Sequence, residues 1–123
     1  MGAKLLFFCG KMAAGKSTLA RALAEKENAL LLVEDEFLER LYPGEIKSIG
    51  DYVKYTSRIK GALAPLIQSL LSKGVSVVLD FPGNTRSQRA WFRAVKPGKH
   101  SCAVRMDAMT LFYFTDGRTG SNL

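Results

Sequence analysis

Residues 10–17 of the chain, GKMAAGKS, constrain its fold more than any other segment, because this glycine-containing stretch separates a strand-like run from a helix-like one. Residues 4–9 (KLLFFC) form a short, continuous apolar run, which is typical of a strand buried on both faces of a parallel sheet. Residues 16–27 place one apolar face at helical spacing, made of Leu19, Ala20, Leu23 and Ala24. The segment therefore predicts a tight loop that joins a buried strand to the N-terminus of a helix.

The same eight residues match the pattern GxxxxGK[ST] at every fixed position. Glycines let the backbone wrap around phosphate oxygens, so that N–H groups and the positive end of the following helix point at the anion. In this pattern Lys16 reaches the β- and γ-phosphates, and the Ser17 hydroxyl coordinates Mg²⁺. The alternative is a glycine-rich turn that caps an ordinary helix. We expect bound Mg-ATP, held by Gly10, Lys11, Met12, Ala13, Ala14, Gly15, Lys16, Ser17 and Thr18.

Strand-like and helix-like segments alternate along most of the remaining chain. Two further apolar runs predict strands, at residues 29–33 (ALLLV) and 75–79 (VSVVL). Helices are predicted over residues 37–41, 51–73 and 86–95, with a kink or break at Pro65 and an end at Gly74. This alternation predicts an α/β fold with right-handed crossovers and a mostly parallel sheet covered by helices on both faces.

The C-terminal part of the chain is less regular. A fourth strand is predicted at residues 103–106 or 111–114, and residues 116–123 have the composition of a polar tail. The chain has 123 residues, of which 47% are hydrophobic, so a single globular domain is expected. We assign residues 1–115 to one nucleotide-binding domain.

Carboxylates follow the second and third predicted strands. Asp80 ends the run VSVVLD, where a carboxylate can hold Mg²⁺ directly or through water, although an Asp at a strand end is also a common turn residue. Glu34, Asp35 and Glu36 follow the second strand, where one of them could accept a proton from an acceptor hydroxyl. The alternative is that these acids only favour the N-terminus of the following helix.

Basic residues outnumber acidic ones, and the formal net charge is +7. Arg86, Arg89 and Arg93 share one helical face and could contact a substrate phosphate or nucleic acid. Arg58 and Lys60 on the long predicted helix are similar candidates. For both groups, the alternative is a solvated helix face.

Cysteine usage and hydropathy argue against several other classes of protein. Cys9 and Cys102 are far apart in the sequence, with no CxxC pair or His/Cys cluster, so neither a zinc site nor a disulfide framework is supported. No stretch approaches the length of a membrane span, and the first apolar run is too short for a signal sequence. A soluble, cytoplasmic protein is expected.

The segments GKMAAGKSTLARALA, EDEFLERLYPGEI and residues 51–95 resemble bacterial AAA-type ATP-binding proteins related to zeta-toxin, chloramphenicol phosphotransferase and polynucleotide-kinase-like P-loop kinases. The resemblance implies the three-layer sandwich of P-loop NTPases and ATP-dependent phosphorylation of a small molecule or nucleotide. By position it implies that Asp35 activates the acceptor hydroxyl, with Glu36 beside it as a second candidate. Arg58 and Arg86 are further candidates for substrate contact.

The C-terminal segment departs from this family. Such kinases continue with a strand and an Arg-bearing lid, whereas here only residues 102–105 (CAVR) resemble the start of a lid, so the fold is expected to be incomplete at this end. An arginine that stabilises the transition state contributes ~10³ to 10⁵ in rate in related systems. Three hypotheses follow: a small-molecule or nucleotide kinase, an ATP-binding regulator or incomplete fragment without phosphotransfer, and a polynucleotide 5′-end kinase.

Overall fold

The computed structural model describes residues 3–10, 15–95, 100–106 and 109–115. Lys11, Met12, Ala13 and Ala14 of the predicted phosphate loop, and the predicted tail, lie outside the described residues. The elements run in the order β1 (Lys4–Gly10), α1 (Lys16–Lys26), β2 (Leu30–Val33), α2 (Glu34–Leu41), α3 (Ile49–Ser72), β3 (Val77–Asp80), α4 (Arg86–Val95), β4 (His100–Met106) and β5 (Met109–Thr115).

The strands form one sheet in the order β2-β3-β1-β5-β4. β1, β2 and β3 run parallel, with Leu5 beside Val77 and Val33 beside Asp80. The carboxyl ends of β2 and β3 are therefore in register. In parallel α/β sheets, this is the edge at which binding residues gather.

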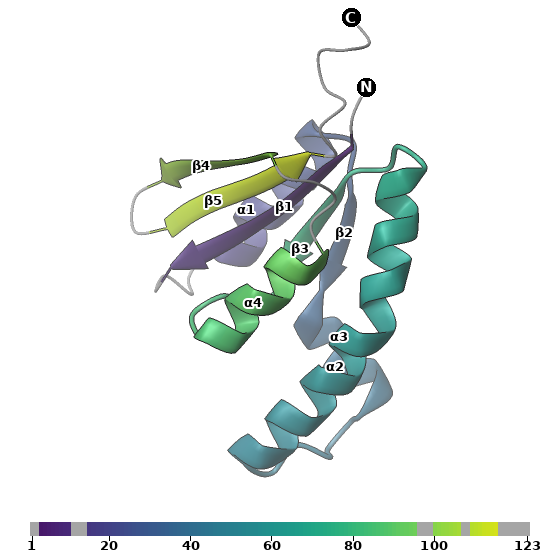
Figure 1. Cartoon of the computed structure of the whole chain (residues 1–123). Coiled ribbons are helices and arrows are strands. Elements are labelled where there is room, and N and C mark those ends of the chain that lie inside the picture. The colour runs from purple at the N-terminus through teal and green to yellow at the C-terminus, as the bar shows by residue number, and fades with distance from the viewer. Residues whose placement is uncertain (1–2, 11–14, 96–99, 107–108, 116–123) are drawn as a thin grey trace, which may run out of the picture.

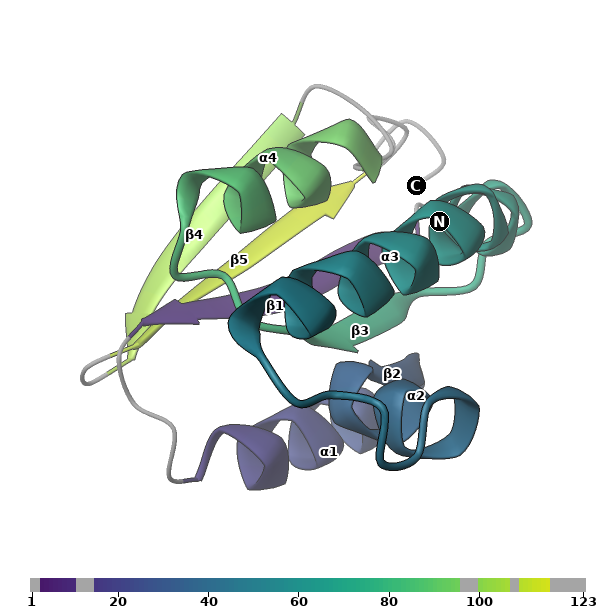
Figure 2. The same ribbon diagram turned by 90° about the horizontal axis from the view of Figure 1, so that it is seen from below.

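Helices cover both faces of the sheet, as Figures 1 and 2 show, with α1 on one side and α3 and α4 on the other. Leu5 and Phe7 of β1 pack in the core cluster shared with α3 and α4, and Phe7 stacks on Phe92 with ring centroids 3.9 Å apart. Leu6 and Phe8 point to the opposite face and pack with α1. The continuous apolar run of β1 is thus explained, since both of its faces are buried. The expected α/β fold of the P-loop NTPase type is confirmed.

Local hydrogen bonds define where the helices begin and end. α1 and α3 each end in a Schellman arrangement around a left-handed residue, Asn28 with φ +52° and Gly74 with φ +84°. At the start of α4, the Thr85 hydroxyl accepts a bond from the Gln88 N–H, and the Gln88 side chain accepts one from the Thr85 N–H. This reciprocal pair is a capping box. It fixes the loop that joins β3 to α4.

Three details differ from the sequence-based expectations. α2 begins at Glu34, so the three acids form its first turn instead of preceding it. Pro65 lies inside α3, and the helix continues through it from Ile49 to Ser72. Two strands, β4 and β5, form an antiparallel hairpin whose second strand pairs with β1, where one further strand was expected. Residues 102–105, which resemble the start of a lid, lie in β4.

Candidate functional site

The candidate phosphate-binding loop lies between β1 and α1, at the carboxyl edge of the parallel strands. Gly15 takes the N-cap position of α1 with φ +86°, a left-handed conformation that favours glycine, and no side chain caps the helix there. The first N–H groups of a helix have no partner within the helix and attract anions. The N-terminus of α1 therefore directs backbone donors toward the region beside Lys16 and Ser17.

Lys16 and Ser17 both contact the end of β3. The Lys16 Nζ donates a hydrogen bond of 2.8 Å to the carbonyl oxygen of Phe81 and lies 4.0 Å from Asp80 Oδ1. The Ser17 hydroxyl donates a 2.9 Å bond to Asp80 Oδ2. The structure thus joins residues that are more than sixty positions apart in the sequence into one polar group. It brings together three of the predicted site residues.

This group fits a magnesium ion by the chemistry of its donors. Mg²⁺ prefers oxygen ligands, keeps several waters and is usually held by one or two carboxylates together with substrate phosphates. Ser17 and Asp80 supply a hydroxyl and a carboxylate that already touch each other. Within the described part of the chain, no group of three or more His, Cys, Asp or Glu residues could hold a metal alone. A magnesium ion here would therefore depend on nucleotide phosphates for further ligands.

Glu34 is the most deeply buried acidic side chain of the described residues, with 1% of its surface exposed. It follows Val33, which pairs with Asp80, so its backbone lies at the same sheet edge as the Ser17–Asp80 contact. The Tyr52 hydroxyl of α3 donates a 2.7 Å hydrogen bond to Glu34 Oε1. Glu34 Oε2 is buried and has no partner among the described residues. Buried polar atoms of this kind are rare and call for an explanation.

Burial shifts the acid–base behaviour of this group. Desolvation is the largest effect and raises the pKa of Glu34, and the Asp35 charge also raises it. The Tyr52 hydrogen bond and the charges of Lys60 and Lys16 lower the pKa, but they do not cancel the effect of burial. Burial and the bond to Glu34 raise the pKa of Tyr52, so its phenol stays protonated at neutral pH. Burial lowers the pKa of Lys60, and the Glu34 charge opposes that shift. Glu34 therefore interacts with both the phosphate-loop lysine and a lysine of α3.

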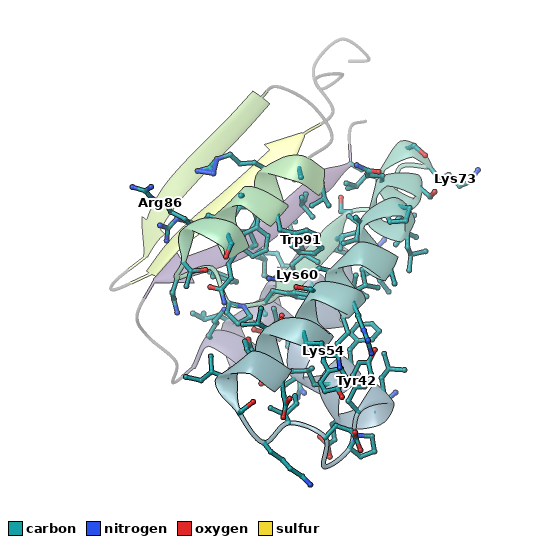
Figure 3. The ribbon with its side chains drawn as sticks, turned by 60° about the horizontal axis from the view of Figure 1, so that its bottom comes forward. Tyr42, Lys54, Lys60, Lys73, Arg86 and Trp91 are labelled. Atoms are coloured by element: carbon teal, nitrogen blue, oxygen red, sulfur yellow. The ribbon has the colours of Figure 1, made fainter. Side chains whose placement is uncertain are left out.

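A pocket of about 620 Å³ lies beside this group, between α3 and the start of α4. Tyr52, Lys60 and Trp91 line it, and Figure 3 shows Lys60 and Trp91 between the two helices. The Lys60 Nζ lies 5.6 Å from the centre of the Trp91 ring, and Trp91 stacks on Phe81 at 5.3 Å. Trp91 Nε1 is the second buried side-chain polar atom without a partner among the described residues. The rest of the wall is formed by Ile49, Val53, Thr56, Ser57, Gly61, Ala64, Thr85, Ser87 and Gln88.

The other predicted site residues lie outside this group. Asp35 and Thr18 are exposed, and Glu36 is exposed with its carboxylate 3.9 Å from Arg21. Arg58 is exposed and lies over the ring of Tyr55, 5.6 Å from its centre. Arg86 extends away from Lys60 and Trp91 in Figure 3. Their expected roles remain predictions.

Glu34 was named from the sequence only as one of three acids, with Asp35 favoured among them, and Tyr52 and Trp91 were not assigned to the site. For Glu34 a signal was present, because it lies two residues after Leu32 and four before Leu38, and both leucines are buried. Strand residues two apart share a face, and so do helix residues four apart. Glu34 therefore lies on the same inward-facing side as Leu32 in the strand and Leu38 in the helix. Tyr52 and Trp91 carry no such signal, since their relation to Glu34 depends on how α3 and α4 pack.

Comparison with known proteins gives one finding. A family model described as an AAA domain matches residues 5–109, which covers β1 through the start of β5. No curated protein and no solved structure matches the chain. Of the described helices, none is long and apolar enough to cross a membrane. Because the match spans most of the chain, and β1 and α1 flank the motif as it requires, the chain belongs to this AAA domain family and is a P-loop nucleotide-binding protein.

Proposed function

We propose that this protein is an ATP-dependent phosphotransferase that moves the γ-phosphate of Mg-ATP to a hydroxyl of a small molecule. The observation that supports this most is the hydrogen-bonded pair Glu34–Tyr52, because the buried Glu34 senses the charge of Lys16 and the half-buried Tyr52 lines the pocket that also contains Trp91. A protein that only binds nucleotide needs the Lys16–Ser17–Asp80 group alone. A phosphotransferase also needs a second, acceptor-sized pocket beside it.

On the nucleotide side, the contacts of Lys16, Ser17 and Asp80 support the roles proposed for them. Lys16 would leave the Phe81 carbonyl for the β- and γ-phosphates, and the N–H groups at the start of α1 would bind phosphate oxygens. Ser17 and Asp80 would hold the magnesium ion. When bound, that ion neutralises charge on the β- and γ-phosphates.

On the acceptor side, the pocket favours an uncharged molecule with a flat or apolar part. Lys60 is the only charged side chain in its wall as described, and hydroxyl and amide groups of Thr56, Ser57, Thr85, Ser87 and Gln88 provide the other polar contacts. Phosphorylated ligands are usually held by arginines, which this wall lacks in its described part. A polycationic ligand would be repelled by Lys60, and the described residues of the wall include no carboxylate to bind it. A nucleoside fits these requirements, and its base could stack on Trp91.

A second candidate function is nucleotide binding without transfer. It is favoured by the β4–β5 hairpin, which occupies the segment in which related kinases would carry a lid. An end kinase of nucleic acid has less support, because Arg89 is engaged with the Gly83 carbonyl at 3.2 Å and Arg86 points away from the pocket.

The test combines binding and transfer. The chain contains one tryptophan, and that residue lines the pocket, so its fluorescence reports pocket occupancy. We expect uridine to change the fluorescence, and uridine with γ-labelled ATP and Mg²⁺ to yield labelled product, whereas UMP, kanamycin and a 5′-hydroxyl oligonucleotide give less. Tight ATP binding with no labelled product and no phosphate release to water would refute the phosphotransferase and favour the second candidate.

A further inference from the structure

We propose that Tyr52 takes the proton from the acceptor hydroxyl in the pocket and passes its own proton to Glu34, so that Glu34 is the base of the reaction without touching the substrate. This inference rests on the proposed phosphotransfer. It assigns deprotonation to buried Glu34 on α2 acting through half-buried Tyr52 on α3, and not to the exposed Asp35.

The geometry places Tyr52 between Glu34 and the pocket. Tyr52 is one of the residues that line the pocket, whereas Glu34 is 1% exposed and is not one of them. The 2.7 Å bond from the Tyr52 hydroxyl to Glu34 Oε1 connects the two. A proton that leaves a molecule in the pocket can therefore reach the carboxylate through the phenol.

The direction of that hydrogen bond leaves Tyr52 able to receive a proton. Its O–H donates to Glu34, so the lone pairs of the phenol oxygen remain available for a donor in the pocket. An acceptor hydroxyl that enters the pocket is such a donor. The phenol itself stays protonated at neutral pH, which suits a relay and excludes Tyr52 as the final base.

Glu34 is suited to holding the transferred proton. Its Oε2 has no donor among the described residues, and a buried carboxylate with too few donors is less stable than the neutral acid. The charged groups that face it are Lys60 of α3, Lys16 of α1 and Asp35 of α2. The charges of the two lysines lower the pKa of Glu34 and so favour its carboxylate form, whereas burial raises the pKa and favours the protonated form.

The acceptor oxygen forms a bond to the γ-phosphorus of ATP, and the bond between that phosphorus and the β–γ bridging oxygen breaks, with its electron pair leaving on ADP. The acceptor proton moves to the Tyr52 oxygen while the Tyr52 proton moves to Glu34 Oε1. Glu34 then returns its proton to solvent before the next cycle.

Asp35 has a different environment. It is exposed on α2, and no hydrogen bond from the described residues holds it in place. Its charge acts on Glu34 by raising the pKa of that group. Asp35 is therefore expected to tune the base and not to be the base.

The first experiment measures transfer to uridine and to water from labelled Mg-ATP, each over a range of pH, in six variants. Tyr52→Phe and Glu34→Gln should each lower kcat by roughly 10² to 10⁴-fold, the usual contribution of a general base, with the KM for ATP little changed. Tyr55→Phe on α3 and Glu39→Gln on α2 are matched controls, because both residues lie outside the group, and they should keep the wild-type rate. At high pH, where the rate no longer rises with pH, Asp35→Asn should have a kcat within a few-fold of the wild-type value.

The pH profile separates a relay from a structural role. Wild-type kcat should rise with pH as Glu34 loses its proton, and Glu34→Gln should abolish this rise. Asp35→Asn should move the rise to lower pH, because the Asp35 charge raises the pKa of Glu34, and Lys60→Gln should move it to higher pH, because the Lys60 charge lowers it. A merely structural role for Glu34 predicts neither of these opposite shifts.

Several outcomes would overturn the inference. If Tyr52→Phe turns over as fast as Tyr55→Phe, the relay is wrong. If Asp35→Asn loses the pH-dependent rise while Glu34→Gln retains it, the base is Asp35. A wild-type protein that binds ATP but transfers phosphate to neither uridine nor water would instead remove the proposed function itself. Wild-type Trp91 fluorescence and a cooperative melting transition above the assay temperature in each variant would show that a lost rate does not reflect unfolding.

Discussion

Replacing Lys16 by alanine should have two separable effects on stability, one without nucleotide and one with it. In the free protein the change removes the 2.8 Å bond to the Phe81 carbonyl and the 4.0 Å ion pair with Asp80. A hydrogen bond from a charged group in a half-buried site is worth about 1 to 2 kcal/mol. A chain of 123 residues unfolds with an entropy of about 0.26 kcal/mol/K, so this loss lowers the melting temperature by about 4 to 8 °C.

The larger effect appears with nucleotide. A ligand present at one hundred times its Kd stabilises the folded protein by about 2.7 kcal/mol, which corresponds here to a rise of about 10 °C in melting temperature. Lys16 is the side chain that would bind the β- and γ-phosphates, so the alanine variant should lose most of this rise. The same concentration of Mg-ATP should then leave its melting temperature almost unchanged.

A thermal-shift assay with and without Mg-ATP measures both effects. Lys26→Ala is the matched control, because Lys26 is exposed in the last turn of the same helix. It should change the melting temperature by less than about 2 °C and keep the full nucleotide-induced rise. A Lys16→Ala protein that is stabilised by Mg-ATP as much as the wild type would refute the assignment of the loop.

Three further predictions concern other parts of the structure. The folded state raises the pKa of Glu34, so the stability that its proton contributes is lost as the pH rises from the unfolded to the folded pKa. Compared with the wild type, Glu34→Gln should therefore be more stable at pH 7.5 than it is at pH 4. Melting curves with the same pH dependence in both proteins would contradict this. In titrations with ATP, the affinity of Asp80→Asn should depend less on Mg²⁺ than that of the wild type. An unchanged dependence would mean that Asp80 only closes a turn. Phe92→Ala should lose about 3 to 5 kcal/mol in urea unfolding, because it removes the ring stacked on Phe7; a loss under 1 kcal/mol would mean that this core is not packed as described.

The parts of the fold that the sequence predicts are those set by local pattern. The apolar run of β1, the glycine-containing loop and the amphipathic α1 follow each other in the chain, and their order alone predicts a nucleotide loop. The position of Asp80 follows from one general rule, that carboxyl ends of parallel strands meet at one edge. The contact of Asp80 with Ser17 agrees with that reasoning.

The parts that the sequence did not predict depend on the residue at which a helix begins or on contacts between elements that are far apart in the chain. At the junction of β2 and α2, a shift of one residue decides whether Glu34 or Asp35 points inward, because successive helical positions differ by about 100°. Tyr52 and Trp91 come together with Glu34 and Lys60 only because α3 and α4 lie on the same face of the sheet. The antiparallel pairing of β5 with β1 joins the two ends of the chain, which no local periodicity reports.

The position of β1 has a consequence for how the protein is made. Leu5 pairs with Val77 on one side and with Phe114 on the other, so β1 leaves the ribosome before either of its neighbouring strands has been synthesised. Until then, the apolar segment KLLFFCG has two unpaired edges, the kind of surface that chaperones bind and that aggregates in their absence. Closing such long-range pairs is also slow, because the entropy of the intervening chain is lost first. Newly synthesised chains should therefore acquire nucleotide affinity only near the end of folding.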